Sequence, residues 1–554
     1  MPLRCVRMNK RSLPSFPTNV LQRGNEDLLN QRVPVMRNQA LIGVSVFAFG
    51  LFMAWELAGK IVVNDMNSIA FVALACVAFV VAIKILRNWR LGFYSFLIWV
   101  LFEDLVRKFL GNNMAIYFAK DALVGLTYVA LFVDIRRGRA ATFRPPFRVF
   151  FYLFLWLGMV QIFNSNSPSI LYGLMGAKIY FFYVPLMFVS YALIRNDEDL
   201  RKFLVVNAVL AAVISALGIT QAILGNSFLN PTTLAPDLRE LGSLDRVTPL
   251  TNQILSLPSA VFVSSGRFAY YLIVAVIVVM GTAGYLLLYT KRSRNVVFVA
   301  FALLLGATLF SGSRGAVVYV VASVLVLAVG FLWGAPWRWR QAHGMVKAVR
   351  RAFIVGSLAL AAVLLLFPDQ AGSRLAFYTE TLSPSSSAYE GQNRAWDYPL
   401  LNLKLAFTNK NWVLGNGIGT ASLGGQYVAR FTGSPPLNIW VEEGYGLLII
   451  EMGILAPFLW LLWTGSLVIT GWRALRRLRQ TRFFPIGFAI LWYAFLLLYP
   501  LTFGGMVPYQ NYVTNAYLWL LVGILFRLPS LLVQQPDPAV VGSSERAGDG
   551  GLQF

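Results

Sequence analysis

Histidine and cysteine, the residues that most often bind metals or form disulfides, are almost missing from this chain. The 554 residues include one histidine, His343, and two cysteines, Cys5 and Cys76. The cysteines lie in a basic stretch and in an apolar run, so they imply neither a disulfide framework nor a thiolate metal site. His343 has no acidic or nucleophilic neighbours, and no Asp, Glu and His residues have the spacing of metal ligands. We therefore expect no metal and no cofactor.

Charged residues are also scarce. They make up 13% of the chain, where a soluble globular protein carries about 25%, and 57% of the residues are hydrophobic. Long apolar runs alternate with short basic clusters, which is the pattern of an all-α polytopic integral membrane protein. The first 38 residues are polar and basic, so we expect no cleavable signal peptide.

Acidic residues are the scarcer of the two signs of charge. The chain has 24 Asp and Glu against 47 Lys and Arg, which gives a formal net charge of +23. Such an excess can serve nucleic-acid binding, but most of these basic residues fall on one side of the predicted topology, as the positive-inside rule requires. We therefore expect the lipid bilayer rather than nucleic acid as a partner, with both termini in the cytoplasm.

Apolar runs of about 17 to 25 residues are long enough to cross the hydrocarbon core of a membrane. We count about fourteen, at 39–57, 68–86, 91–110, 118–135, 147–164, 172–193, 202–224, 267–290, 295–312, 314–333, 352–367, 443–471, 484–502 and 512–530.

These runs divide the chain into five parts. The predicted order is a basic cytoplasmic tail (1–38), eleven spans (39–367), a large outer loop (368–441), three further spans (442–530) and a disordered cytoplasmic tail (531–554). Within the large loop, the stretch from Asn393 to Gly415 has apolar residues at helical spacing and predicts an amphipathic helix.

A single charged residue, Arg314, interrupts the apolar run from Val296 to Trp333. One straight helix over this run would be about 57 Å long, nearly twice the hydrocarbon thickness. We therefore predict two spans joined by an outer turn at Ser311–Gly315, with Arg314 starting the second helix. An arginine beside free helix N–H groups favours an anion, phosphate in particular. The alternative is an arginine that only extends its side chain to the membrane interface.

Further charges fall near the same outer face. Arg267, Lys178 and Lys120 lie at or within predicted spans, where ionisable groups usually face a bundle interior or a water-filled cavity. Several cations near one face favour an anionic ligand. For the charges at the outer ends of the third and fourth spans we favour mutual ion pairing instead. That group comprises Glu103, Asp104, Arg107, Lys108, Lys120 and Asp121.

Two adjacent carboxylates, Glu442 and Glu443, open the predicted twelfth span, and Glu451 follows two helical turns deeper. A carboxylate at a partly dry interface can have a raised pKa and act as a general base. The alternative is that the pair only occupies the positive end of a helix, where acidic residues are stabilising. The sequence does not choose between Glu442 and Glu443.

Three stretches form a recognisable set. LFSGSRGAVV (309–318) has an S-R-G turn between two predicted spans. Residues 393–422 combine the predicted outer-loop helix, with Arg394 near its start, and a Gly-x-Gly-x-Gly after it. VEEGYGLLIIEMGILAP (441–457) starts the next predicted span. Together, in this order and spacing, they resemble the O-antigen polymerase and O-antigen ligase superfamily of bacterial membrane glycosyltransferases. The glycines of GNGIGT (415–420) do not match G-x-G-x-x-G, so we expect no nucleotide site.

The resemblance implies a metal-independent, GT-C-like transferase at the periplasmic face of the bacterial inner membrane. Its donor would be an oligosaccharide on undecaprenyl pyrophosphate, and its partners would include other polysaccharide assembly proteins, such as a flippase and a chain-length regulator. Arg314, Arg394 and Arg267, with Lys178 behind them, would stabilise the pyrophosphate leaving group. Glu442 or Glu443 would take the proton from the attacking hydroxyl. The residues expected to bind substrate are Arg267, Lys178, Lys120 and Trp396.

One departure from the family pattern and one further resemblance favour a polymerase that joins repeat units over a ligase. Ligases of the family carry a histidine where this chain has Glu442 and Glu443, and residues 106–132 resemble a subgroup of exopolysaccharide polymerases. The alternatives are a ligase that transfers glycan to lipid A core or another acceptor, and a transporter or flippase of lipid-linked sugars. A transporter of this kind would be expected to show two related halves, and we find no such internal symmetry.

Overall fold

The computed structural model describes residues 66–111, 113–231, 245–290, 292–337, 350, 354, 365–434, 437 and 441–533. The predicted first span, most of the eleventh, the N-terminal tail, nearly all of the C-terminal tail and His343 lie outside these residues. The chain divides into two compact units, Met1–Lys84 and Ile85–Phe554. Helix α2 (Met66–Arg87) covers the predicted second span and ends just inside the second unit.

The second unit is helical apart from one short hairpin. Its elements are α3 (Trp89–Leu110), α4 (Met114–Arg136), α5 (Arg148–Gln161), α6 (Ile170–Phe181), α7 (Leu186–Leu193), α8 (Asp197–Leu224), η1 (Asn226–Phe228), β1 (Asp245–Val247), β2 (Ile254–Ser256), α10 (Ser265–Tyr289), α11 (Arg294–Phe310), α12 (Arg314–Gly334), α14 (Pro368–Leu382), η2 (Asn393–Asp397), α15 (Tyr398–Phe407), α16 (Gly425–Thr432), α17 (Gly444–Met452), α18 (Leu455–Arg477), α19 (Phe484–Leu496), η3 (Leu497–Leu501), α20 (Thr502–Gly504), α21 (Val507–Gln510) and α22 (Tyr512–Val533).

By length and composition, eight helical segments among the described residues can cross a membrane. They are Met114–Arg136, Ile170–Leu193, Asp197–Leu224, Ser265–Tyr289, Arg314–Gly334, Leu455–Arg477, Phe484–Gly504 and Tyr512–Val533. The helices α5 and α11 are apolar but shorter. Helix α3, at the predicted third span, carries too many charges to count among the eight. These segments confirm the prediction of an all-α membrane protein.

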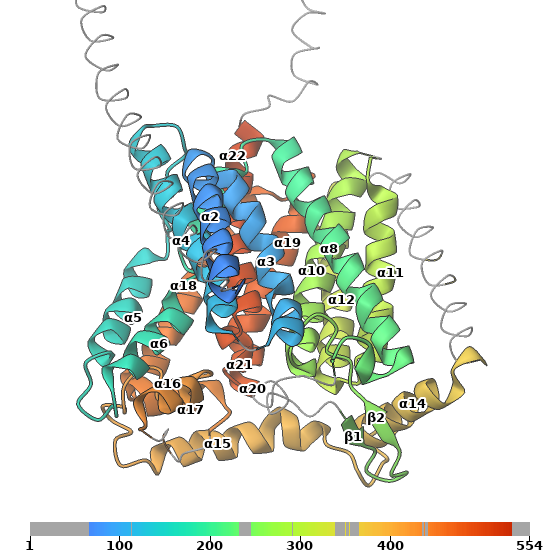
Figure 1. Cartoon of the computed structure of the whole chain (residues 1–554). Coiled ribbons are helices and arrows are strands. Elements are labelled where there is room, and N and C mark those ends of the chain that lie inside the picture. The colour runs from blue at the N-terminus through green and yellow to red at the C-terminus, as the bar shows by residue number, and fades with distance from the viewer. Residues whose placement is uncertain are drawn as a thin grey trace, which may run out of the picture. The chain divides into compact units, whose positions relative to one another are not determined.

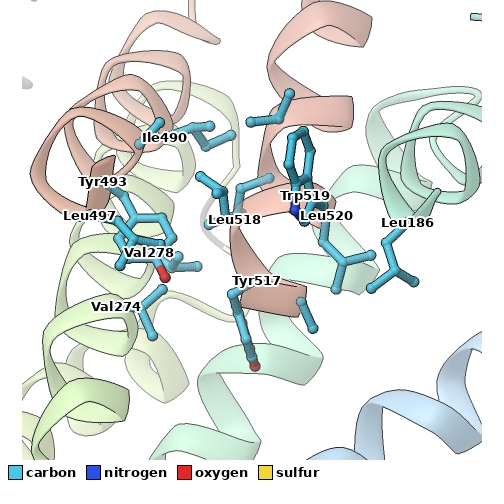
Figure 2. Close-up of a cluster of buried hydrophobic side chains, with 14 of the residues drawn as sticks. Leu186, Val274, Val278, Ile490, Tyr493, Leu497, Tyr517, Leu518, Trp519 and Leu520 are labelled. Atoms are coloured by element: carbon cyan, nitrogen blue, oxygen red, sulfur yellow. The ribbon is translucent and has the colours of Figure 1, made fainter. Parts of the chain in front are cut away.

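Helix α10 forms the centre of the second unit. Its sequence is apolar on every face, as expected for a helix surrounded by others. Of its most apolar 18-residue stretch, 78% is buried. In Figure 2, Val274 and Val278 of α10 face Tyr493 and Leu497, with Tyr517 of α22 close by. The hydroxyl of Tyr493 donates to the carbonyl of Thr514 at 2.9 Å, so this aromatic core satisfies its polar atom internally.

The helices α8, α10, α11 and α12 pack side by side, and α14 lies with the hairpin at one end of them (Figure 1). The two strands pair antiparallel, with Arg246 opposite Leu255. Glu380 of α14 fixes the hairpin loop, because its carboxylate accepts hydrogen bonds from the backbone N–H of Leu250 (2.8 Å) and Thr251 (3.3 Å). The hairpin and α14 therefore form one layer at the end of the bundle where α11 ends and α12 begins.

The predicted twelfth span, 443–471, is not one helix. The chain breaks at Gly453, which has φ +81°, and α17 and α18 lie on either side of the break. The backbone N–H of Ile454 donates to the carbonyl of Val413 at 3.2 Å, so the outer loop enters the break. A side chain at Gly453 would collide with that same carbonyl. The apolar run was long enough for one span, but the sequence pattern did not reveal this contact.

Candidate functional site

The turn between α11 and α12 lies where the length of the apolar run predicted it. Gly312 has φ +66°, a conformation that glycine adopts readily, and Ser313 caps α12 by accepting from the backbone N–H of Ala316 at 3.3 Å. Arg314 is the first residue of α12. The serine cap occupies one of the helix N–H groups that we expected an anion to use.

Arg314 and Arg394 meet at a carboxylate that the sequence did not single out. Nη1 of Arg314 lies 2.9 Å from Oε2 of Glu390, and Nε of Arg394 lies 3.6 Å from the same oxygen. The exposed side-chain fractions are 16% for Arg314, 58% for Arg394 and 35% for Glu390, so water or a ligand can reach this group. Two residues predicted as catalytic, 80 positions apart, are therefore brought together.

A third arginine, Arg246 of β1, completes the group. Burial and then the positive charges of Arg314 and Arg394 lower the pKa of Arg246, which places it within electrostatic range of both. The guanidinium groups of Arg246 and Arg314 lie over the ring of Phe377, at 5.9 and 5.2 Å from its centroid. We name Arg246, Arg314, Arg394 and Glu390 the arginine cluster. Three guanidinium groups against one carboxylate leave an excess of positive charge, which suits a phosphate or pyrophosphate.

These arginines stabilise the ionised form of Glu390. Partial burial raises the pKa of Glu390, but the hydrogen bonds and charges of Arg314 and Arg394 outweigh burial, and its pKa lies below the usual range. Glu390 is therefore an anion at neutral pH and holds the two guanidinium groups in place.

Arg374 fixes the position of α14, the helix that carries Phe377. Its guanidinium is buried and donates to three main-chain carbonyls, those of Phe310 (3.0 Å), Ala222 (3.2 Å) and Ser256 (3.0 Å). Phe310 ends α11 and Ala222 lies in the last turn of α8, so Arg374 satisfies carbonyls at two helix ends. Burial lowers the pKa of Arg374 to about 10. The same helix presents Phe377 to the cluster, one turn further along.

The two adjacent glutamates have different surroundings. Glu443 is buried and caps α17, since its carboxylate accepts from the backbone N–H of Tyr445 (2.9 Å) and Gly446 (2.5 Å). Glu443 lies outside the eight candidate spans. Burial raises its pKa to about 7, although the hydrogen bonds from the two N–H groups lower it. Glu443 therefore occupies the positive end of a helix, which is the alternative to a catalytic role.

Glu442 is partly exposed and is placed differently. Its backbone N–H donates to the side-chain oxygen of Asn402 at 3.1 Å, and its carbonyl accepts from the backbone N–H of Met506 at 3.2 Å. Its carboxylate lies within electrostatic range of the Tyr270 hydroxyl, which in turn is in range of Tyr319 on α12. Glu442 is therefore held by its backbone, while its carboxylate is on the side where α10 and α12 begin.

The three cations expected to bind substrate, Arg267, Lys120 and Lys178, are each paired with a carboxylate. The pairs are Arg267–Asp104 at 2.7 Å, Lys120–Glu103 at 2.8 Å and Lys178–Asp121 at 2.6 Å. These contacts join α3 to α4 and α10, and α4 to α6. For Arg267 and Lys120 the structure thus shows ion pairing of the kind we favoured for the charges on α3 and α4.

Two further members of the charged group on α3 and α4, Arg107 and Lys108, have different partners. Arg107 contacts Glu103 at 3.5 Å and Asp104 at 3.2 Å, as expected for mutual pairing. Lys108 instead donates to the hydroxyl of Ser259 and the carbonyl of Ala260, both at 2.9 Å. The group therefore fixes the segment before α10 as well as the ends of α3 and α4.

Trp396, also expected at the substrate site, lies on η2 beside Arg394. The residue is 62% exposed, and its ring packs against Phe503 of α20, with 5.8 Å between ring centroids. The neighbouring helix α15 buries Pro399, Asn402 and Ala406 and exposes leucines on its other side. An exposed aromatic and leucine surface next to cations suits a ligand with both sugar and lipid parts.

The glycines of GNGIGT serve packing. Gly415, Gly417 and Gly419 all have φ between +80° and +102°, and a side chain at Gly419 would collide with the carbonyl of Tyr172. Glu451 holds this loop, because its carboxylate accepts from Ser422 Oγ (2.7 Å) and the backbone N–H of Ala421 (3.0 Å). The motif therefore joins the outer loop to α6 and α17.

No protein-family model, curated protein or solved structure matches this chain. Within the described part of the chain, no group of three or more His, Cys, Asp and Glu side chains is placed to hold a metal ion. What the fold defines directly is an all-α protein with several helices able to span a membrane.

Proposed function

We propose that this chain is a membrane glycosyltransferase of the O-antigen polymerase and ligase kind, which joins oligosaccharide repeat units carried on undecaprenyl pyrophosphate. In this proposal it has about fourteen spans in a GT-C-like arrangement in the bacterial inner membrane, with cytoplasmic termini and a periplasmic site. The observation that supports it best is the arginine cluster, where three arginines converge on one accessible carboxylate at the ends of the helices.

The proposed reaction uses the cluster as a leaving-group site. The bond between the anomeric carbon of the donor sugar and the pyrophosphate oxygen breaks, and negative charge develops on the pyrophosphate. Guanidinium groups already in place stabilise that charge, because they need little reorganisation during the step. Arg314 and Arg394 donate to the phosphate oxygens, and Arg246 adds charge from the hairpin.

The acceptor side of the reaction needs a base. The acceptor hydroxyl oxygen bonds to the anomeric carbon and its proton passes to a carboxylate. We assign this role to Glu442, since its side chain is partly exposed. Both carboxylate oxygens of Glu443, by contrast, already accept hydrogen bonds from helix N–H groups. The products are the elongated glycan and undecaprenyl pyrophosphate.

The other predicted residues fit the proposal in different ways. Trp396 is available to contact a sugar ring or the lipid, since it is exposed beside Arg394. Arg267, Lys120 and Lys178 are paired with carboxylates, so we assign them to positioning of the helices that carry the site. A flippase and a chain-length regulator remain proposed partners.

The experiment that tests the proposal is a profile of lipid-linked glycans in cells that express the wild-type chain or Arg314→Ala at equal protein level. The expected result is single lipid-linked repeat units without long polymer for the variant. Arg292→Ala, at an exposed arginine between α10 and α11, is the control and should leave the profile unchanged.

The same profile distinguishes the alternatives. Polymer that forms on the carrier lipid but is never transferred would identify a ligase instead. Polymer of unchanged length in Arg314→Ala would contradict the role of the cluster. Elongation by purified protein without a bilayer would exclude a transporter, because transport requires two compartments.

A further inference from the structure

A second concentration of arginines lies at the opposite ends of the helices. Lys108, near the end of α3, contacts Ser259 just before α10 begins, so the start of α3 lies at the other end of the unit from the start of α10. Helices α10 and α12 are joined through the antiparallel α11, so the start of α3 is also remote from Arg314. The positive-inside rule assigns this end to the cytoplasm.

A pocket of about 410 Å³ opens at this end. That volume lies within the range of small-ligand sites, roughly 300–1,000 Å³. Its walls come from the end of α2, the start of α3, the loop after α4, the loop between α7 and α8, and α22. The charged residues that line it are Arg87, Arg90, Arg139, Arg195, Arg527 and Asp134.

The acidic residues around this pocket do not balance its arginines. Asp199, next to the pocket, lies 3.9 Å from Arg90 and 3.5 Å from Arg195, and it is shared between them. Among the residues that the structure describes, no ion pair joins Arg87, Arg139 or Arg527 to a carboxylate. Burial and then the positive charge of Arg195 lower the pKa of Arg90, so the two cations are close enough to repel each other. The pocket therefore has a strong excess of positive charge.

Two of these side chains are held in place without a ligand. Arg527 donates from Nε to the carbonyl of Ile194 at 2.7 Å and lies over the ring of Tyr191, 5.2 Å from its centroid. Arg90 lies 5.3 Å from the centroid of Trp89. Guanidinium groups that are already oriented lose little freedom when they bind an oxyanion. Arg87 and Arg139, by contrast, are exposed at the rim.

The rim also carries exposed apolar side chains. Leu86, Leu91 and Val133 are exposed next to Arg87, Arg90 and Asp134. Apolar side chains at the ends of membrane helices suit contact with acyl chains, and basic pockets between such helices bind anionic headgroups.

We propose that this arginine-lined pocket binds a phosphate group, carried either by an anionic phospholipid or by a soluble phosphate compound. The inference does not depend on the glycosyltransferase proposal, since it uses other residues at the other end of the helices. A guanidinium group binds phosphate through two parallel hydrogen bonds, so loss of two rim arginines should weaken binding by at least about tenfold.

The test is isothermal titration calorimetry of the full chain in an uncharged detergent. The probes are dihexanoyl phosphatidylglycerol and inorganic pyrophosphate, titrated separately. The test variant is Arg87→Gln with Arg139→Gln, at two exposed positions where a folding defect is not expected. The control is Arg473→Gln with Arg476→Gln, which removes the same charge from exposed positions near the end of α18.

The proposal predicts that the test variant binds at least one probe about tenfold more weakly, whereas the control binds like wild type. Weakening of phosphatidylglycerol alone assigns the site to a lipid headgroup, and weakening of pyrophosphate alone assigns it to a soluble phosphate. Equal weakening in both variants would show only general surface charge and would overturn the site. Failure of the wild-type chain to bind either probe would also overturn it.

Discussion

Replacement of Arg314 by glutamine should remove chain elongation and leave the fold almost unchanged. The ion pair of Arg314 with Glu390 is 2.9 Å long, but both side chains are partly exposed. Pairs of this kind contribute about 0–1 kcal/mol to stability, and an arginine over an aromatic ring adds about 0.5–1 kcal/mol. We therefore expect Arg314→Gln to lower the free energy of unfolding by at most about 2 kcal/mol.

Arg374 provides the contrasting variant. It is buried and donates to three main-chain carbonyls, and each carbonyl left without a donor costs about 1–3 kcal/mol. Arg374→Gln should therefore destabilise the chain by about 3 kcal/mol or more and lower the unfolding temperature further than Arg314→Gln.

Two measurements on purified protein compare these variants. Thermal unfolding is followed by intrinsic fluorescence, and elongation is followed with an undecaprenyl-pyrophosphate-linked repeat unit as substrate. The loss of one preorganised donor to a developing anion typically costs about 10²–10³ in rate, and this is the loss expected for Arg314→Gln. Near-normal elongation by Arg314→Gln, or unfolding at the low temperature of Arg374→Gln, would refute the reasoning.

Three further predictions each compare two forms of the chain. Glu442→Gln should reduce elongation by about 10²–10⁴ without a change in unfolding temperature, whereas Glu443→Gln should retain elongation; the opposite result would assign the base to Glu443. The raised pKa of Glu443 means that the folded state binds its proton more tightly. The stability gained from this proton is full below pH 4.5 and is lost as the pH rises through about 7. The unfolding temperature of wild type should therefore fall across this range more than that of Glu443→Gln, and parallel profiles would contradict the assignment. Gly419→Ala should destabilise the chain by more than Gly433→Ala, because both positions have positive φ but only at Gly419 does a side chain collide, with Tyr172; equal unfolding temperatures would show that the loop adapts.

The helices and the turn before Arg314 could be predicted from the sequence because they depend on local patterns. The run around Arg314 is too long for one span and contains serine and glycine, so both the break and its place follow from length and turn chemistry. The placement of Glu443 at a helix start also agrees with one of the two interpretations that the sequence left open.

Contacts between distant segments could not be predicted in the same way. Glu390 lies just after a serine-rich stretch with no periodic pattern, and its contact with Arg314 depends on the direction of the chain after α14. Arg246 enters the cluster only because a short hairpin lies against α14. The break at Gly453 likewise depends on a loop about 40 residues away along the chain.

The two-point contact of Glu390 with Arg314 and Arg394 also has a consequence for turnover. In the proposed mechanism an arriving phosphate must displace a carboxylate that is part of the protein, so substrate binding exchanges one anion for another. This competition weakens binding of the lipid-linked donor in its ground state and leaves more of the guanidinium interaction for the charge that develops later. After bond cleavage the same carboxylate competes with undecaprenyl pyrophosphate, so Glu390 would speed the departure of a product that carries more negative charge than the substrate.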